Sequence, residues 1–197
     1  DWKKWLSNMS EKDEDFNFEP YQKEISSIKS SIDRQINRVQ NSIKALFLDK
    51  DALLAFKTMN KVVHKSWLKR PCFCNSGLLI EGCDCNEEFS WRGFQLAFIF
   101  LGIESFIIKK GKEQNESRNL VDLLHFPTGG GKTEAYLGIV SFSALFFRLK
   151  EKKGEEKEGI IAVMRYTLRL LSSQQFQRAS RTICSLEEVR ISNQNLW

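Results

Sequence analysis

The sequence lacks any apolar run long enough to cross a bilayer. Its longest apolar stretch, residues 96–108, is interrupted by Gly102, Glu104 and Ser105, whereas a membrane-spanning helix needs about 20 apolar residues in a row. The first 16 residues also lack the apolar segment of a signal peptide, so we expect no secretory signal. With 42% apolar and 28% charged residues, the composition is that of a globular protein.

A strong charge of one sign and an internal repeat are also missing. Lysine and arginine number 30 against 25 acidic residues, which gives a net charge of +5. This mild balance permits a nucleic-acid partner without requiring one. The chain begins with Asp1 and ends at Trp197 without an evident closing element, so we expect it to be a piece of a longer polypeptide.

Helical periodicity dominates the first third of the chain. Apolar residues recur every three or four positions from Ile25 to Leu46, which predicts an amphipathic helix. A second helix is expected at 51–67, with Asp49 or Asp51 near its N-cap and Pro71 after its end. Its predicted buried residues are Leu54, Met59, Val62 and Val63.

The rest of the chain alternates between apolar runs and helical patterns. A helix at 92–108 is apolar almost all round, which predicts that it packs in a core. After it the sequence predicts strands at 120–126 and 159–165, each followed by a helix, at 133–148 and 168–190. Strands alternating with helices indicate an α/β fold with a parallel sheet.

The segment PTGGGKT predicts a phosphate-binding loop. Glycines let backbone N–H groups approach phosphate oxygens, and the next helix directs its positive end toward them. Lys132 would reach the β- and γ-phosphates of ATP, and the Thr133 hydroxyl would complete the shell of Mg²⁺. The predicted phosphate-binding residues are Pro127, Thr128, Gly129, Gly130, Gly131, Lys132 and Thr133, with the last two as catalytic residues.

One position departs from the general pattern GxxxxGK followed by Ser or Thr. Phe126 stands where that pattern has glycine, and the sequence fits the shorter form PTGxGKT. This form resembles motif I of superfamily 2 helicases. The alternative is a glycine-rich turn in which lysine and threonine occur by chance.

Upstream, WRGFQLAF resembles the R-x-F/Y-Q element that superfamily 2 helicases carry before motif I. The resemblance implies that Gln95 hydrogen-bonds the adenine edge, since an amide offers both a donor and an acceptor. It also implies that Arg92 or Phe94 packs on the base. The alternative is a helix N-terminus with Phe94 in the core and Gln95 in solvent.

Downstream, VMRYTLRLLSSQQFQR occupies the place of helicase motif Ia, which contacts the nucleic-acid backbone. Arg165, Thr167 and Arg169 are the predicted contacts; Thr167 could bind a phosphate and cap the helix, and Arg178 adds charge. The alternative is an amphipathic helix with its arginines in solvent and with Leu170, Leu171, Phe176 and Ile183 buried.

Together, FPTGGGKTEAYLG, VMRYTLRLLSSQQFQRASRTIC and WRGFQLAFIFLGIES resemble the large helicase subunit of DISARM anti-phage systems, and AFKTMNKVV (55–63) fits its N-terminal helical region. The resemblance covers roughly residues 50–190. It implies a bacterial, cytoplasmic, ATP-dependent protein that acts on DNA with a DUF1998-type partner subunit.

The resemblance also implies how the chain is organised. An N-terminal helical region at 1–70 and a cysteine-bearing loop at 71–90 precede the first part of a RecA-like ATPase lobe at 91–197. No DExx-type strand follows the last helix to hold Mg²⁺ and orient water; Glu187 and Glu188 are expected to be surface charges. We therefore expect this chain alone to hydrolyse no ATP.

Four cysteines, Cys72, Cys74, Cys83 and Cys85, form two C-x-C pairs. Without a signal peptide disulfides are not expected, and four thiolates could hold a structural Zn²⁺. The alternative is ordinary reduced cysteines, since C-x-C is tighter than the usual C-x-x-C. Cys184 is predicted to be buried, and neither His64 nor His125 has a ligand-spaced companion.

Two further functions fit the same residues. A P-loop ATPase could act as a conformational switch in a DNA-binding complex without unwinding DNA, which an unwinding assay would distinguish. The chain could instead be a zinc-stabilised interaction module with a vestigial P-loop, against which a measurable affinity for ATP would argue.

Overall fold

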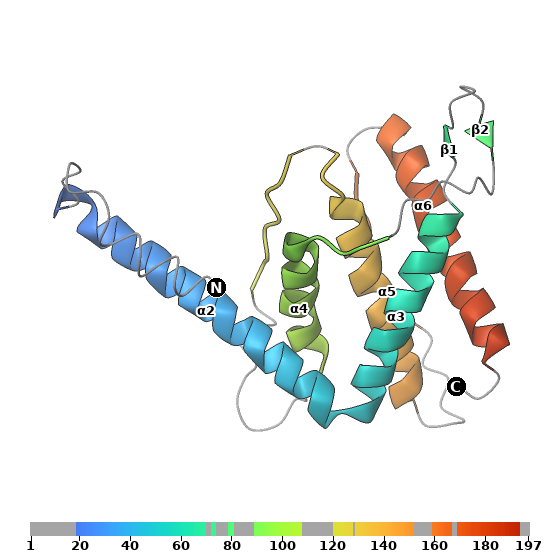
Figure 1. The fold of residues 1–197 in the computed structure, drawn as a ribbon, viewed down its shortest axis with the longest axis horizontal. Helices are drawn as coiled ribbons and strands as arrows, with labels where there is room; N and C mark the ends of the chain where they lie inside the picture. Colours follow the sequence, from blue (N-terminus) through green and yellow to red (C-terminus); the bar gives the residue numbers. More distant parts are fainter. Residues whose placement is uncertain are drawn as a thin grey trace.

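The computed structural model describes residues 19–69, 72–73, 79–80, 89–107, 120–127, 129–151, 159–166 and 169–193. Helices dominate this part of the chain (Figure 1). In chain order the elements are η1 (Glu19–Tyr21), α2 (Gln22–Leu48), α3 (Lys50–Leu68), β1 (Cys72–Phe73), β2 (Leu79–Ile80), α4 (Gly93–Ile107), α5 (Lys132–Lys150) and α6 (Arg169–Ser192). The five long helices confirm those predicted from periodicity.

A sharp corner joins α2 to α3 at Asp49. This residue is extended, and its side chain accepts hydrogen bonds from the backbone N–H groups of Asp51 and Ala52, at 3.0 and 3.2 Å. An aspartate in this position satisfies N–H groups that have no partner within the helix. The predicted N-cap is therefore confirmed at Asp49. The N-terminal part of α2 projects away from the other helices (Figure 1).

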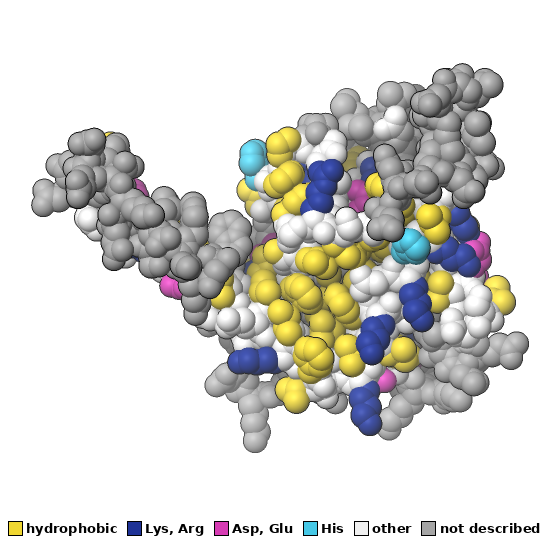
Figure 2. Space-filling view, viewed as in Figure 1, with side chains coloured by type: hydrophobic (Ala, Val, Ile, Leu, Met, Phe, Trp, Pro, Cys, Tyr) yellow, Lys and Arg dark blue, Asp and Glu magenta, His cyan; other side chains and the backbone are white. Residues whose placement is uncertain are grey.

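The core lies where α3, α4 and α5 pack together. Its largest fully buried side chains are Phe142, Met59, Ile99, Ile103 and Leu145, and burying each contributes about 2 kcal/mol. Residues from both 1–70 and 91–197 thus form one core. Figure 2 shows further apolar side chains gathered at the middle of one face, where α4 and α5 lie side by side.

The parallel sheet predicted for a RecA-like lobe is wrong for this structure. Segments 120–126 and 159–165 belong to no strand, and the only strand pairing in the described residues joins β1 and β2, antiparallel. Val121, Leu123 and Ile160 are 95%, 89% and 86% exposed. A short apolar run favours an extended backbone, but a strand also needs a neighbour that pairs with it. The described fold is therefore helix packed on helix.

Helix α6 buries a face that its apolar residues did not indicate. Phe176 and Ile183 are exposed, whereas Thr182, Ser185 and Val189 are buried. The Ser66 and Thr182 hydroxyls share a hydrogen bond of 3.1 Å between α3 and α6, so small polar residues form this contact. The alternative of an amphipathic helix is therefore wrong for Phe176 and Ile183, and the side chains of Leu170 and Leu171 lie outside the described residues.

Two more burial predictions fail. Cys184 is exposed on α6, because the buried face of that helix is the one with Thr182 and Ser185. On α3, Met59, Val62 and Val63 are buried as predicted, but Leu54 is 40% exposed.

Glu187 and Glu188 are surface charges as predicted, paired with Arg190 and with the lysines at 65 and 69. None of the described helices is long and apolar enough to span a membrane.

Candidate functional site

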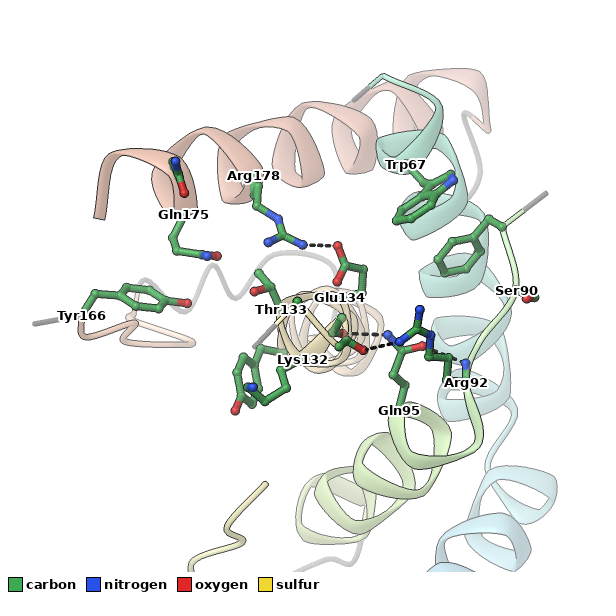
Figure 3. A pocket seen from close by; sticks show the side chains of 16 residues that line it. Trp67, Ser90, Arg92, Gln95, Lys132, Thr133, Glu134, Tyr166, Gln175 and Arg178 are labelled. Carbon is green, nitrogen blue, oxygen red and sulfur yellow. Dashed lines mark hydrogen bonds and ion pairs between the residues drawn. The ribbon is translucent and has the colours of Figure 1, made fainter. Parts of the chain in front are cut away.

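The candidate site is a cavity of about 870 Å³ at the point where α5 begins. The glycine-rich loop and the first turn of α5 form its floor, and the starts of α4 and α6 form two of its sides (Figure 3). Its volume lies in the range typical of small-molecule sites. The described lining residues include Gly129, Gly130, Gly131, Lys132, Thr133, Arg92, Gln95, Glu134 and Arg178.

Glycine is required at two positions of the loop. Gly129 and Gly131 have φ angles of 80° and 85°, which other residues adopt only at a cost. Gly131 is the N-cap of α5. The first turn of this helix, whose backbone N–H groups have no partner within the helix, therefore lies at the cavity. Lys132 donates hydrogen bonds to the carbonyls of Phe126 and Pro127, the latter at 3.1 Å.

Gln95 fastens the start of α4 to this loop. Its side chain is only 4% exposed; its Oε1 accepts from the Arg92 N–H at 2.8 Å, and its Nε2 donates to the Gly131 carbonyl at 2.7 Å. Arg92 donates to the Gly130 carbonyl at 3.1 Å. The residues predicted from R-x-F/Y-Q and PTGGGKT therefore meet. The alternative of a solvated Gln95 is wrong, and adenine recognition stays a prediction.

Phe94 stacks on Phe126, directly before the loop. The ring centroids lie 3.9 Å apart with 15° between the planes. The phenylalanine at position 126, where the general P-loop pattern has glycine, therefore packs against the start of α4. Both residues stand out in the sequence, but nothing in their spacing predicts that they pair. A base-packing role for Phe94 stays a prediction.

Helix α6 contributes a side of the cavity that sequence reasoning missed. Arg178 forms an ion pair with Glu134, which follows Thr133 in α5 (Figure 3). Tyr166 lines the same side, and burial, with a smaller effect of Tyr136, raises the pKa of its phenol. The sequence signal for this side of the cavity was Glu134, the residue directly after GKT. Because Glu134 lies in the first turn of α5, its position beside the loop is fixed.

Aromatic residues before α4 form another side. Trp67 and Phe89 line the cavity, with ring centroids 5.5 Å apart, and Phe89 packs edge-on against Trp91 at 5.0 Å. The Trp91 indole donates to Asn60 Oδ1 at 2.7 Å. The density of aromatics in FSWRGF was the available sequence signal, but it does not distinguish a cavity side from a core.

Several predicted residues cannot be placed in this site. Thr128 and Thr167 lie outside the described residues, as do the side chains of Arg169 and of the cysteines at 72, 74, 83 and 85. Arg165 is exposed. Within the described ranges, no group of three or more histidine, cysteine or acidic residues could hold a metal ion. The zinc and DNA contacts therefore stay predictions.

A known bacterial protein is similar to most of this chain. The chain is 41% identical over 161 residues to DISARM protein DrmA of Bacillus paralicheniformis, which covers 79% of this chain. The chain spans only 14% of the length of that relative. No protein-family model matches the chain, and no solved structure matches it. The chain is therefore similar to a part of a DISARM protein.

Proposed function

We propose that this chain forms the nucleotide-binding part of an ATP-dependent DNA helicase or translocase of superfamily 2 that acts in bacterial anti-phage defence. One observation carries the proposal: the glycine loop, Lys132 and Thr133 open into a cavity beside Arg92 and Gln95. The similarity to a DISARM protein supports the defence role. The motif resemblance supports a cytoplasmic location and a DUF1998-type partner subunit.

The residues at the loop fit a triphosphate. A Cβ at Gly131 would lie 2.7 Å from Gln95 Nε2, so glycine keeps the loop backbone close to α4 and without a side chain of its own. Free N–H groups at the start of a helix attract anions. Lys132 would bind the β- and γ-phosphates, and the Thr133 hydroxyl would ligate Mg²⁺. When bound, ATP with Mg²⁺ supplies the phosphoryl transfer that would drive movement on DNA.

Binding by the whole 197-residue chain tests this proposal. Titration of a fluorescent ATP analogue with Mg²⁺ should give weak, saturable binding that unlabelled ATP displaces. Lys132→Ala should abolish it, because it removes the cation nearest to the phosphates. Lys44→Ala, on the exposed surface of α2, is the control and should leave the affinity unchanged. Equal affinity for wild type and Lys132→Ala would overturn the proposal.

The DNA part of the proposal has its own test. Arg165 is exposed at the end of a segment that leads toward α6, and the proposal gives it, Thr167 and Arg169 contacts to the phosphate backbone. Arg165→Ala should weaken DNA binding equally for unrelated sequences and reduce the salt dependence by about one unit of slope. Arg34→Ala, exposed on α2, is the control. An unchanged slope would contradict this contact.

A further inference from the structure

Two arginines of α6 lie near the carboxylate of Glu134, beside the phosphate loop. Arg178 lines the cavity and pairs with Glu134. Arg181 lies one turn further along α6, and its Nε is buried with no hydrogen-bond acceptor among the described residues. Both guanidinium groups are close enough to Glu134 to feel its charge.

The cluster therefore carries more positive than negative charge in a partly buried place. Burial lowers the pKa of Arg181, and the charge of Arg178 lowers it further, while Glu134 opposes both effects. Guanidinium groups in such a setting are stabilised by a second anion. The described part of the cavity lining also has an excess of positive charge, because it contains three basic residues, Arg92, Lys132 and Arg178, and a single acidic residue, Glu134.

The position of Arg178 indicates which anion the two arginines would bind. Figure 3 views α5 nearly end-on, with Arg178 from α6 on one side of its first turn and Arg92 on the other. Lys132 and Thr133 belong to that turn. A phosphate held by Lys132 would thus have Arg178 as a neighbour in the same cavity. Arg165, which the proposed function assigns to DNA, is not among the described residues that line this cavity.

We propose that Arg178 is a ligand of the terminal phosphate of a bound nucleoside triphosphate, exchanging the carboxylate of Glu134 for the γ-phosphate while Arg181 remains beside Glu134. This assignment rests on the proposed nucleotide binding. No covalent bond changes in the exchange: one charge-assisted ion pair replaces another. Arg178 therefore lets the site distinguish a triphosphate from a diphosphate, and it couples α6 to the state of the nucleotide.

The experiment compares ATP and ADP affinities with Mg²⁺ for variants of the whole chain. Arg178→Ala should lower the affinity for ATP about tenfold or more and that for ADP less than about threefold, as expected for a lost charged hydrogen bond to one phosphate. Arg190→Ala removes a half-exposed arginine of the same helix, which pairs with Glu187, and should change neither affinity. Arg178→Lys keeps the positive charge but cannot form the bidentate hydrogen bonds of a guanidinium group, so it should lose part of the ATP affinity.

The substitution Glu134→Gln tests whether Arg178 is a ligand of the phosphate or only holds α5 and α6 together. It frees Arg178 from its carboxylate, so the affinity for ATP should stay unchanged or rise. If the ion pair served only to hold α5 and α6 together, Glu134→Gln would lower the affinity as Arg178→Ala does, which would overturn the assignment. Arg178→Lys decides the question if Arg178→Ala does not fold, as judged by circular dichroism.

Failure of this inference is distinguishable from failure of the proposed function. If the wild type binds ATP and Lys132→Ala abolishes binding, while Arg178→Ala lowers ATP and ADP affinities equally, Arg178 does not contact the terminal phosphate. Loss of DNA binding in Arg178→Ala with an unchanged ATP-to-ADP ratio would assign it to nucleic acid instead. Absence of ATP binding by the wild type would overturn both proposals.

Discussion

Arg38 on α2 and Asp122 form a two-point ion pair, with Nη1–Oδ1 and Nη2–Oδ2 distances of 2.6 and 2.9 Å. The same guanidinium donates to Glu104 Oε2 and to the Leu101 carbonyl, both at 3.1 Å. Hydrogen bonding to Asp122 raises the pKa of Arg38 against the effect of burial. One side chain thus joins α2, α4 and the segment that enters the phosphate loop.

We expect Arg38→Ala to destabilise the fold strongly. Glu104 is buried, so loss of the guanidinium removes the positive charge that pairs with both Glu104 and Asp122. Breaking a buried ion pair on one side costs about 3 kcal/mol or more. Urea unfolding followed by circular dichroism would measure this change. Arg34→Ala, on the exposed surface of the same helix, should stay within about 0.5 kcal/mol of wild type; equal effects of the two substitutions would contradict the prediction.

Asp49 should make the stability depend on pH in the acid range. Burial raises the pKa of its carboxyl, but hydrogen bonds from Lys150 and from the backbone N–H groups of Ala52 and Asp51 lower it more, so the pKa lies below its ordinary value of 3.8. Because the pKa of Asp49 is lower in the folded state than in the unfolded chain, its ionised carboxyl stabilises the fold above pH 3.8. This stabilisation is lost as the pH falls through the pKa of the folded state.

The test uses two substitutions of Asp49. Asp49→Ala removes cap and charge and should lower the free energy of unfolding by about 1 kcal/mol at neutral pH. Asp49→Asn keeps the cap and removes the charge, so its difference from wild type should shrink as the pH falls below 3.8. A difference that is the same at pH 7 and well below pH 3.8 would show that the carboxyl is not stabilised by its charge.

Gly131→Ala should damage the phosphate loop in two ways. The positive φ strains any other residue by about 1–2 kcal/mol, and the new Cβ would lie 2.7 Å from Gln95 Nε2. Both stability and ATP affinity should fall. Gly129→Ala has the same strain with open space around its Cβ, so it isolates the effect of strain. Gly93→Ala meets no neighbour within 4 Å and is the control; loss of affinity there too would refute the loop explanation.

The cysteine pairs should hold zinc in the purified chain. If the thiolates of Cys72, Cys74, Cys83 and Cys85 bind it together, metal analysis should find about one Zn²⁺ per chain. Cys72→Ser or Cys85→Ser should lose the metal and lower the solubility. Cys184→Ser removes an exposed cysteine of α6 and should keep it. Protein never exposed to chelator that contains no zinc would decide for ordinary reduced cysteines.

Several features of this protein followed from the sequence alone because they depend on neighbours in the chain. Apolar spacing of three and four residues is a property of a single helix, so the helices and the Asp49 cap were predictable. The glycine run followed by Lys132 and Thr133 likewise marks a turn at a helix start. The strands predicted at 120–126 and 159–165 are wrong, because a strand exists only where another segment pairs with it, and an apolar run in the sequence does not show whether such a partner is present.

The tertiary structure decided which polar side chains meet. Gln95 and Gly131 are 36 residues apart, Glu134 and Arg178 are 44 apart, and Arg38 and Asp122 are 84 apart. No periodicity in a sequence selects one arginine out of 30 basic residues to face a given carboxylate. That choice depends on how α2, α4, α5 and α6 pack, because a buried charge is tolerated only where the packing brings a partner to it.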